Sequence, residues 1–288
     1  MCDETDLARW AKSGLSRRQF SAMGVAAGIA ACTPGDEARG QQSGLSESEV
    51  SFATEDGTMD AFFVHPASGA APAVILWPDI AGLREAKMAM ARRLADAGYA
   101  VLAVNPYYRD TPAPQFSDFA DFSAKQGFQV VGPWREKLDH AAITRDAAAI
   151  VAWLDTQDAV DTAKGIGSQG YCMTGSFAIR TVAARPDRVK AAASFHGGGL
   201  VTEEPTSPHK LLKESAHYLI AVAQNDDAKA PGDKDALRQA AADAGVQAEI
   251  EVYPADHGWC VLDAPSYAEA EANRAWDRLL ALYSGALA

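Results

Sequence analysis

Short apolar runs alternate with stretches of helical spacing along most of the chain. The apolar runs predict strands at Val50–Ala53, Met59–Val64, Ala73–Trp77, Tyr99–Val104, Val189–Phe195, Tyr218–Ala223 and Glu249–Tyr253. Helical spacing predicts helices at Arg84–Ala97, Arg135–Gln157 and Tyr267–Tyr283. Strands that alternate with helices are typical of an α/β domain with a mostly parallel central sheet flanked by helices, which we place at residues 49–288. The first two strands surround Glu55-Asp56-Gly57, which predicts an N-terminal hairpin.

The first 48 residues have a different pattern. An arginine pair at residues 17–18 precedes Ser21–Ala31, an uncharged run of small and apolar residues that is too short to span a bilayer. This arrangement is typical of a twin-arginine export signal, which we place at residues 1–32. Residues 33–48 are rich in Gly, Gln, Ser and acidic groups and predict a flexible linker. We therefore expect a protein that is exported by the twin-arginine pathway.

The end of the predicted signal, Ile29-Ala30-Ala31-Cys32, resembles a bacterial lipobox. In that case Cys32 would carry a lipid that anchors the protein to a membrane. Cleavage by ordinary signal peptidase is the alternative. The two alternatives predict a protein that is lipid-anchored in the cell envelope or free in the periplasm.

The composition is that of a globular protein and excludes some partners. Of the 288 residues, 48% are hydrophobic and 22% are charged, which suffices for a core without disulfide or metal support. The net charge of -12 argues against a nucleic acid partner, because phosphate binding requires clustered basic residues. Four cysteines in a chain of this length do not form a disulfide framework, so each needs its own explanation. The His and acidic residues lack the spacing of a metal site such as H-E-x-x-H, and we predict neither a metal nor another cofactor.

One cysteine lies in a sequence typical of a nucleophile elbow, Gly170-Tyr171-Cys172-Met173-Thr174-Gly175. In such an elbow a sharp turn between a strand and a helix exposes the middle side chain, and small neighbours relieve the crowding. The usual motif has glycine two positions after the nucleophile, whereas this chain has Thr174 there and Gly175 one position later. A buried and inert cysteine is the alternative interpretation. The overlapping residues 165–170 fit G-x-G-x-x-G, but no buried strand is predicted before them, and we discount a dinucleotide site.

An acid and a histidine follow the elbow along the chain. Asp226 and Asp227 come after the strand Tyr218–Ala223, and His257 comes after the strand Glu249–Tyr253. In α/β-hydrolases the nucleophile, the acid and the histidine occur in this order, each just beyond the carboxyl end of a strand. A thiol nucleophile needs a base within hydrogen-bond reach, and the base needs a carboxylate that fixes its tautomer.

These motifs resemble the dienelactone hydrolase family of α/β-hydrolases across the whole predicted domain. That family is unusual in placing a cysteine at the elbow, and its Cys-Asp-His triad maps onto Cys172, Asp226 and His257. Asp227 is the alternative acid; we favour Asp226, which lies three positions after the last residue of its strand. The resemblance implies the α/β-hydrolase fold and the hydrolysis of a small ester or lactone through a thioester acyl-enzyme.

The resemblance also assigns residues that would meet the substrate. Backbone N–H groups of Ile80 and Met173 would hold the developing oxyanion. Asp79 occupies the position at which the family has an acidic residue that interacts with the resting thiol; a simple loop carboxylate is the alternative. Arg109 lies where family members present an arginine to a substrate carboxylate, while the position of a second such arginine is Val261 here. Carboxylate recognition is therefore only half present, which argues against dienelactone itself as the substrate and leaves the hydrolytic residues unaffected.

Two more features have alternative explanations. The stretch His196-Gly197-Gly198-Gly199 resembles an oxyanion motif of lipases, but it follows the elbow instead of preceding it, and we interpret its glycines as a tight turn. Cys260 lies three residues after His257, and it is either a small apolar filler or a disulfide partner that would silence Cys172 in an oxidising envelope. For the activity, the alternatives are a general carboxylesterase or thioesterase, and a non-catalytic protein that binds a ligand in the same cleft.

Overall fold

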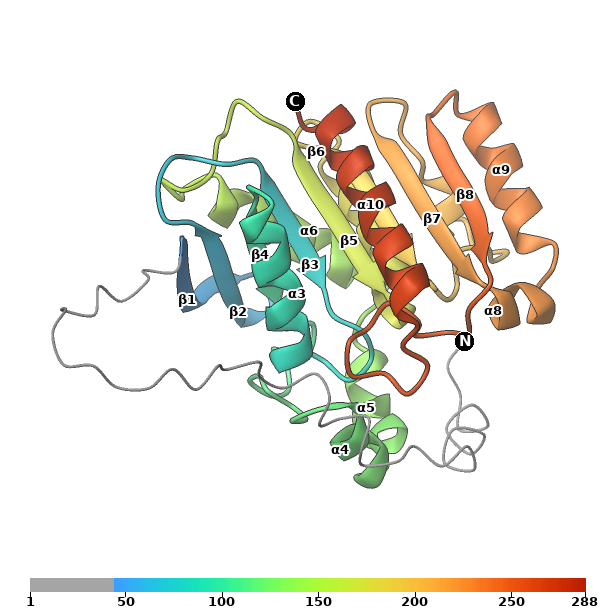
Figure 1. Cartoon of the computed structure of the whole chain (residues 1–288), viewed down its shortest axis with the longest axis horizontal. Helices are drawn as coiled ribbons and strands as arrows, with labels where there is room; N and C mark the ends of the chain where they lie inside the picture. Colours follow the sequence, from blue (N-terminus) through green and yellow to red (C-terminus); the bar gives the residue numbers. More distant parts are fainter. Residues whose placement is uncertain (1–43) are drawn as a thin grey trace, which may run out of the picture.

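One sheet of eight strands organises the part of the chain that the computed structural model describes, residues 44–288 (Figure 1). The strands are β1 (Leu45–Thr54), β2 (Gly57–Pro66), β3 (Ala73–Trp77), β4 (Ala100–Val104), β5 (Ile166–Tyr171), β6 (Val189–Phe195), β7 (His217–Ala223) and β8 (Ala248–Tyr253). Their order in the sheet is β1-β2-β4-β3-β5-β6-β7-β8. The pairs β1–β2 and β2–β4 are antiparallel, and all other neighbours are parallel. The predicted mostly parallel α/β fold with an N-terminal hairpin is confirmed.

Helices cover both faces of this sheet. They are α3 (Glu85–Asp96), α4 (Phe119–Ala124), α5 (Gly127–Arg135), α6 (His140–Leu154), α7 (Gly175–Ala184), α8 (Gln224–Lys229), α9 (Asp233–Asp243) and α10 (Glu269–Ala286). Successive side chains of a strand point to opposite faces. In β3, Ile75 and Trp77 accordingly pack with residues of α6 and α7, while Val74 and Leu76 pack with residues of α3 and α10. The core therefore has two apolar layers, one on each side of the sheet.

The hairpin begins earlier than predicted. Leu45 pairs with Pro66, so that β1 includes residues 45–48, which the sequence predicts as part of the linker. Most side chains of β1 are exposed, so residues 45–48 lack the apolar pattern that predicts a strand. Backbone pairing with β2 defines the strand instead. Residues 1–43, which include the predicted export signal and Cys32, lie outside the described residues.

The stretch between residues 127 and 171 also differs from the prediction. The expected helix Arg135–Gln157 is instead the end of α5 followed by α6, because Asp139 caps α6 by accepting a hydrogen bond from the N–H of Ala142 at 2.7 Å. The central strand β5 was not predicted, because its glycines and polar residues lack the apolar pattern of a buried strand. Its Gly167 is needed because a Cβ there would lie 2.7 Å from the ring of Tyr283 on α10.

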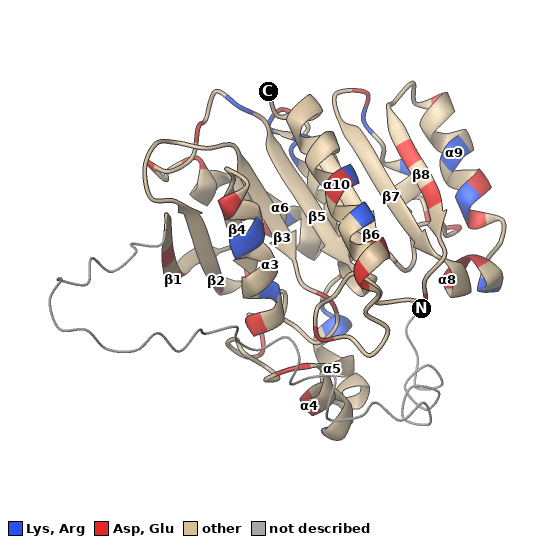
Figure 2. Cartoon of the chain, in the orientation of Figure 1, with Lys and Arg blue, Asp and Glu red and all other residues tan. Residues whose placement is uncertain are grey.

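Charged residues lie mainly on the outer helices and at the edges of the sheet. Figure 2 shows both signs of charge on α3, α9 and α10, whereas the central strands β3, β4 and β5 carry none. The edge strand β8 presents Glu249 and Glu251, which pair with Arg278 and Arg274 of α10. Charge on an edge strand disfavours pairing with a strand of another chain.

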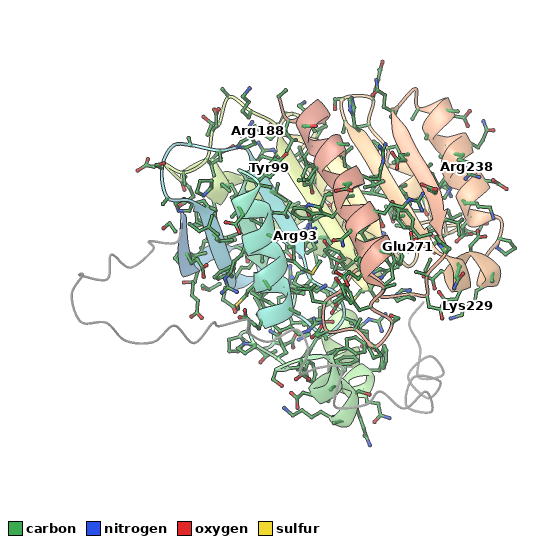
Figure 3. The ribbon with its side chains drawn as sticks, in the orientation of Figure 1. Arg93, Tyr99, Arg188, Lys229, Arg238 and Glu271 are labelled. Carbon is green, nitrogen blue, oxygen red and sulfur yellow. The ribbon has the colours of Figure 1, made fainter. Side chains whose placement is uncertain are left out.

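The helices α3 and α10 contact each other in front of the sheet. Arg93, labelled in Figure 3, extends from α3, and its guanidinium carbon lies 4.1 Å from the ring centre of Trp276 on α10. The same guanidinium donates a hydrogen bond to Oδ1 of Asn273 at 3.1 Å. Stacking of arginine on tryptophan adds a cation–π attraction to the apolar contact between the two helices.

Candidate active site

Five titratable or nucleophilic side chains follow the carboxyl ends of parallel strands. Asp79 comes after β3, Cys172 after β5, His196 after β6, Asp226 after β7 and His257 after β8. The helices α4 and α5 lie beyond this edge of the sheet (Figure 1). Ligand sites of α/β proteins lie at this edge, because the loops that leave the strands converge there.

Cys172 occupies a sharp turn between β5 and α7. Its φ of 57° is in the left-handed region, which is uncommon for a residue other than glycine and marks a strained position. Gly170 makes the turn feasible, because a Cβ at this position would lie 2.0 Å from the carbonyl oxygen of Thr174. This geometry is that of a nucleophile elbow with a thiol at its tip.

The unusual residues after the cysteine fit the elbow. The hydroxyl of Thr174 donates to the carbonyl oxygen of Trp77 and accepts from the N–H of Tyr171, both at 2.9 Å, so it ties the turn to β3 and β5. A Cβ on Gly175 would lie 2.6 Å from the Cα of Gly197 in the loop after β6. Glycine is thus required one position later than in the usual motif, because that is where the β6 loop approaches the helix.

His257 is oriented by two neighbours from α8. Its Nδ1 lies 2.6 Å from Oδ2 of Asp226, and its backbone N–H donates to Oδ1 of Asn225 at 2.8 Å. Asp227, the alternative acid, accepts instead from Nζ of Lys234 at 2.7 Å. The structure therefore brings Asp226, and not Asp227, to the histidine.

The electrostatics around His257 favour its charged form. Burial opposes a charge on the ring, but the negative charge of Cys172 and the hydrogen bond to Asp226 outweigh it and raise the pKa of His257 to about 10. His257 and Cys172 are 2% and 6% exposed, so water screens their attraction poorly. The arrangement favours a thiolate beside an imidazolium, which is the activated form of a cysteine nucleophile.

Asp79 forms a buried ionic network under the nucleophile. Its Oδ1 accepts from Nη1 of Arg84 at 2.8 Å, and its Oδ2 lies 2.9 Å from Nζ of Lys87. Arg84 also donates to Asp263 at 2.7 Å. Burial opposes the charge of Asp79, yet Arg84 and Lys87 hold the pKa of its carboxyl well below the usual range. Asp79 lines a small pocket with Cys172, although the side-chain partners of its carboxylate are these two cations.

The structure does not bring Arg109 to the nucleophile. Its guanidinium donates to Asp146 at 2.7 Å and to Asp56 at 2.6 Å, which ties the turn between β1 and β2 to α6. Both partners are carboxylates of the protein, and Arg109 does not line the cleft beside Cys172. Ion pairs within the chain thus occupy the guanidinium of Arg109, and its expected contact with a substrate carboxylate stays a prediction.

A cleft of about 500 Å³ opens beside the elbow. It is lined by Ile80, Cys172, Met173, His257 and Arg135, together with Gly132, Glu136, Leu138, Ser176, Phe177, Gly198 and Gly199. The cleft thus contains both residues whose backbone N–H groups were expected to hold an oxyanion. Arg135, at the end of α5, was not predicted as a site residue, since no local motif distinguishes it from other surface arginines.

His196 begins a stretch that the sequence analysis interprets as a tight turn, and it was not predicted as a site residue. The residue is 1% exposed, and its ring lies 4.5 Å from the ring of His257, measured between centroids. The loop that follows it also supports the elbow, because the N–H of Gly198 donates to the carbonyl oxygen of Cys172 at 3.1 Å. A histidine directly after the carboxyl end of a predicted buried strand was the signal that could have identified it.

Cys260 lies apart from the cleft. Its thiol is free, as is that of Cys172, and it lines a separate cavity of about 60 Å³ under α3 and α10. Burial raises the pKa of Cys260 to about 12. Of the two explanations offered, the small apolar filler agrees with this placement.

Neither a candidate metal site nor a membrane-spanning helix is present among the described residues. Between residues 44 and 288, no three side chains of His, Cys, Asp or Glu are grouped so that they could hold a metal ion. No helix in the same part of the chain combines the length and the apolar character that a membrane span requires.

Comparison with known proteins identifies relatives along almost the whole domain. A protein of Methylorubrum extorquens named "Putative carboxymethylenebutenolidase" is 27% identical over 279 residues, which cover 93% of this chain and 92% of that protein. A crystal structure from Klebsiella pneumoniae, named "Putative Dienelactone Hydrolase", superposes with a TM-score of 0.70 at 26% identity and covers 83% of this chain and 98% of its own. The Anabaena variabilis dienelactone hydrolase has a TM-score of 0.61 at 16% identity, covers 85% of this chain and 100% of its own, and supports the fold.

A family model describes the same region. The model of the dienelactone hydrolase family matches residues 59–287, which extend from β2 to the end of α10 and include the elbow and the histidine loop. The chain belongs to the dienelactone hydrolase family.

Proposed function

We propose that this chain hydrolyses small carboxylic esters or lactones with Cys172 as the nucleophile. The observation that carries the proposal is the hydrogen bond of 2.6 Å between His257 and Asp226, beside a cysteine on a strained elbow. A carboxylate that orients the histidine places its other ring nitrogen toward the thiol. Membership of the dienelactone hydrolase family supports the same chemistry.

The reaction would proceed in two stages. In the first, Sγ of Cys172 forms a bond to the carbonyl carbon of the substrate, the bond from carbon to the leaving oxygen breaks, and the imidazolium of His257 gives its proton to that oxygen. Backbone N–H groups of Ile80 and Met173, which both line the cleft, would hold the oxyanion. In the second stage water replaces the thiol, with His257 as the base.

The cleft favours a substrate with an apolar body and a negative end. Its lining is mainly apolar, and Arg135 lies there without an ion pair among residues 44–288. An arginine in this position would bind a substrate carboxylate through two parallel hydrogen bonds. Relatives named as carboxymethylenebutenolidases suggest an enol lactone with such a carboxylate. Thiolate is a good leaving group, and therefore activated enol esters and lactones should react faster than alkyl esters.

Export by the twin-arginine pathway, with a lipid on Cys32, is the second part of the proposal. It rests on the sequence of residues 1–32. Fractionation of cells that express the full chain would place the protein in the membrane fraction, and Cys32→Ser would release it to the periplasm. Recovery of the whole protein from the cytoplasm would refute export.

A substrate panel with a matched variant tests the activity. Dienelactone, enol lactones and simple aryl esters are compared as substrates of the full chain and of Cys172→Ala. The proposal predicts turnover that is lost in the variant and is fastest for carboxylate-bearing enol lactones. Equal hydrolysis by the variant would favour the alternative, a protein that binds a ligand in this cleft without catalysis.

A further inference from the structure

His196 combines strain, burial and unsatisfied polar atoms. Its φ of 42° lies in the left-handed region, and its backbone N–H donates to the carbonyl oxygen of Ala221 at 2.8 Å. Neither ring nitrogen has a hydrogen-bond partner among the described atoms of the protein. Buried polar groups without partners destabilise a fold, and in native proteins they point to a functional role or to an ordered solvent molecule.

The protein surroundings of the ring are aromatic on several sides. Its centroid lies 4.5 Å from that of His257, 5.2 Å from that of Trp259 and 6.2 Å from that of Tyr171. A phenylalanine would satisfy these ring contacts as well as a histidine does. The two nitrogen atoms therefore need a reason other than packing.

The ring also lines a small pocket at the nucleophile. This pocket is lined by Asp79, Ile80, Phe119, Cys172, His196 and His257, with Gly258, Val261 and Ala264. Its volume of about 10 Å³ is close to the minimum that holds one water molecule. Cys172 and His257 border the same space, so a water there would be adjacent to an acyl group on the sulfur.

We propose that His196 binds the water that hydrolyses the acyl-enzyme, which makes it a catalytic residue of deacylation. The inference rests on the proposed function. The water oxygen forms a bond to the thioester carbonyl carbon, one water proton moves to Nε2 of His257, and the second hydrogen is held by a ring nitrogen of His196. The C–S bond then breaks, the carboxylic acid is released, and the proton stays on His257, which restores the thiolate of Cys172 beside an imidazolium.

The charges around His196 keep it in the form that this role requires. Burial, the charge of His257 and the charge of Lys87 lower the pKa of His196 well below its usual value, against the opposing charge of Asp79. A neutral imidazole has one donor and one acceptor nitrogen, so it can accept a hydrogen bond from water, whereas an imidazolium cannot.

The test separates acylation from deacylation in the full chain with p-nitrophenyl acetate. His196→Phe keeps an aromatic ring and removes both nitrogens, and His196→Gln keeps a donor and an acceptor. We expect the first turnover of His196→Phe to proceed at the wild-type rate within about threefold, while steady-state turnover falls by about 10²-fold, as is typical of a lost group in proton transfer. Acetylated protein should then accumulate, as seen by intact mass, and His196→Gln should recover part of the turnover.

Two results would overturn the role assigned to His196, and a third would instead refute the proposed function. Equal slowing of both phases in His196→Phe and His196→Gln would mean that the residue is structural, and unchanged turnover would mean that it has no role. Thermal unfolding identifies a misfolded variant, and we expect the Tm of both variants to stay close to that of the wild type. Undiminished hydrolysis by Cys172→Ala would instead refute the proposed function itself.

Discussion

Nδ1 of His257 donates a hydrogen bond to Oδ2 of Asp226 over 2.6 Å, while the neighbouring Asp227 binds Lys234. An ionised carboxylate only accepts hydrogen bonds, so this contact fixes the proton of the ring on Nδ1. Nε2 is then the nitrogen that exchanges a proton with the thiol. Two adjacent aspartates on one short helix thus have separate roles, one in orienting the base and one at the surface.

The two aspartates provide a matched pair of variants. Asp226→Asn would favour the wrong tautomer of His257 and should lower kcat by about 10³- to 10⁴-fold, as in other triads. Asp227→Asn removes a partly exposed ion pair with Lys234 and should leave kcat within about twofold of the wild type. Steady-state kinetics on one activated ester measures both, and a larger loss in Asp227→Asn would contradict the assignment of the acid.

The pKa of His257 should depend on Cys172. The charge of Cys172 is the largest influence that raises it, so in Cys172→Ala the pKa should fall from about 10 toward 6.5. NMR titration of the ring measures this shift, and an unchanged value would mean that no thiolate lies beside the ring.

The same pKa has a consequence for stability. Because the pKa of His257 is higher in the folded than in the unfolded chain, protonation of the ring stabilises the fold. This stabilisation is fully present below about pH 6.5 and is lost as the pH rises through about 10. Below about pH 8.5 the unfolded thiol of Cys172 binds the proton that the folded pair holds on the ring, so the free energy of unfolding of the wild type should decline mainly between about pH 8.5 and 10. This decline should exceed that of Cys172→Ala, as measured by urea unfolding.

The network around Asp79 should contribute strongly to stability. Asp79→Asn would leave Arg84 and Lys87 buried without their shared anion, which should cost about 3–5 kcal/mol of unfolding free energy. Glu85→Gln, which breaks a surface pair with Arg92, should cost less than about 1 kcal/mol. Chemical denaturation of both variants tests this contrast. Equal losses of unfolding free energy would show that the buried network contributes no more than a surface ion pair.

The two arginines should differ in function. Arg135→Met should raise KM for carboxylate-bearing esters by about tenfold or more, since a hydrogen bond to a charged group contributes about 1.5–3 kcal/mol. The KM for neutral aryl esters should not change. Arg109→Met should lower Tm because the buried Asp146 loses its positively charged partner, and it should leave both KM values unaltered. An effect of Arg109→Met on carboxylate substrates alone would restore the sequence-based assignment.

The two cysteines of the domain should differ in reactivity. A thiol reagent at neutral pH should label Cys172 in the folded protein, whereas Cys260 should react only after unfolding, because burial holds its pKa near 12. Peptide mapping after labelling identifies the site. A disulfide between the two cysteines after air oxidation would refute the view that Cys260 is an inert filler.

The chain order of strands and reactive residues could be predicted because each signal is local. Strand β3 is a continuous apolar run, Cys172 lies in an elbow motif although its strand β5 has no apolar signal, and His257 follows the predicted strand β8. The fold places the carboxyl ends of these strands together, so local signals in the right order are sufficient to predict the constellation.

The rest of the site depends on contacts between distant segments. The sequence alone predicts that Arg109 binds substrate. In the fold it lies between Asp56 and Asp146, which are 53 and 37 positions away along the chain. Arg135 reaches the cleft only through the position of α5, and His196 becomes notable only through its contact with His257. Such pairings are properties of the packed structure, and no periodicity or motif records them.

The most direct test of the central assignment is intact mass spectrometry of the protein quenched during turnover of an activated ester. We predict an acyl adduct that maps to the peptide containing Cys172, is labile to hydroxylamine as a thioester is, and is absent from Cys172→Ala. Turnover without any adduct, at the same rate in Cys172→Ala as in the wild type, would contradict a cysteine nucleophile at this elbow.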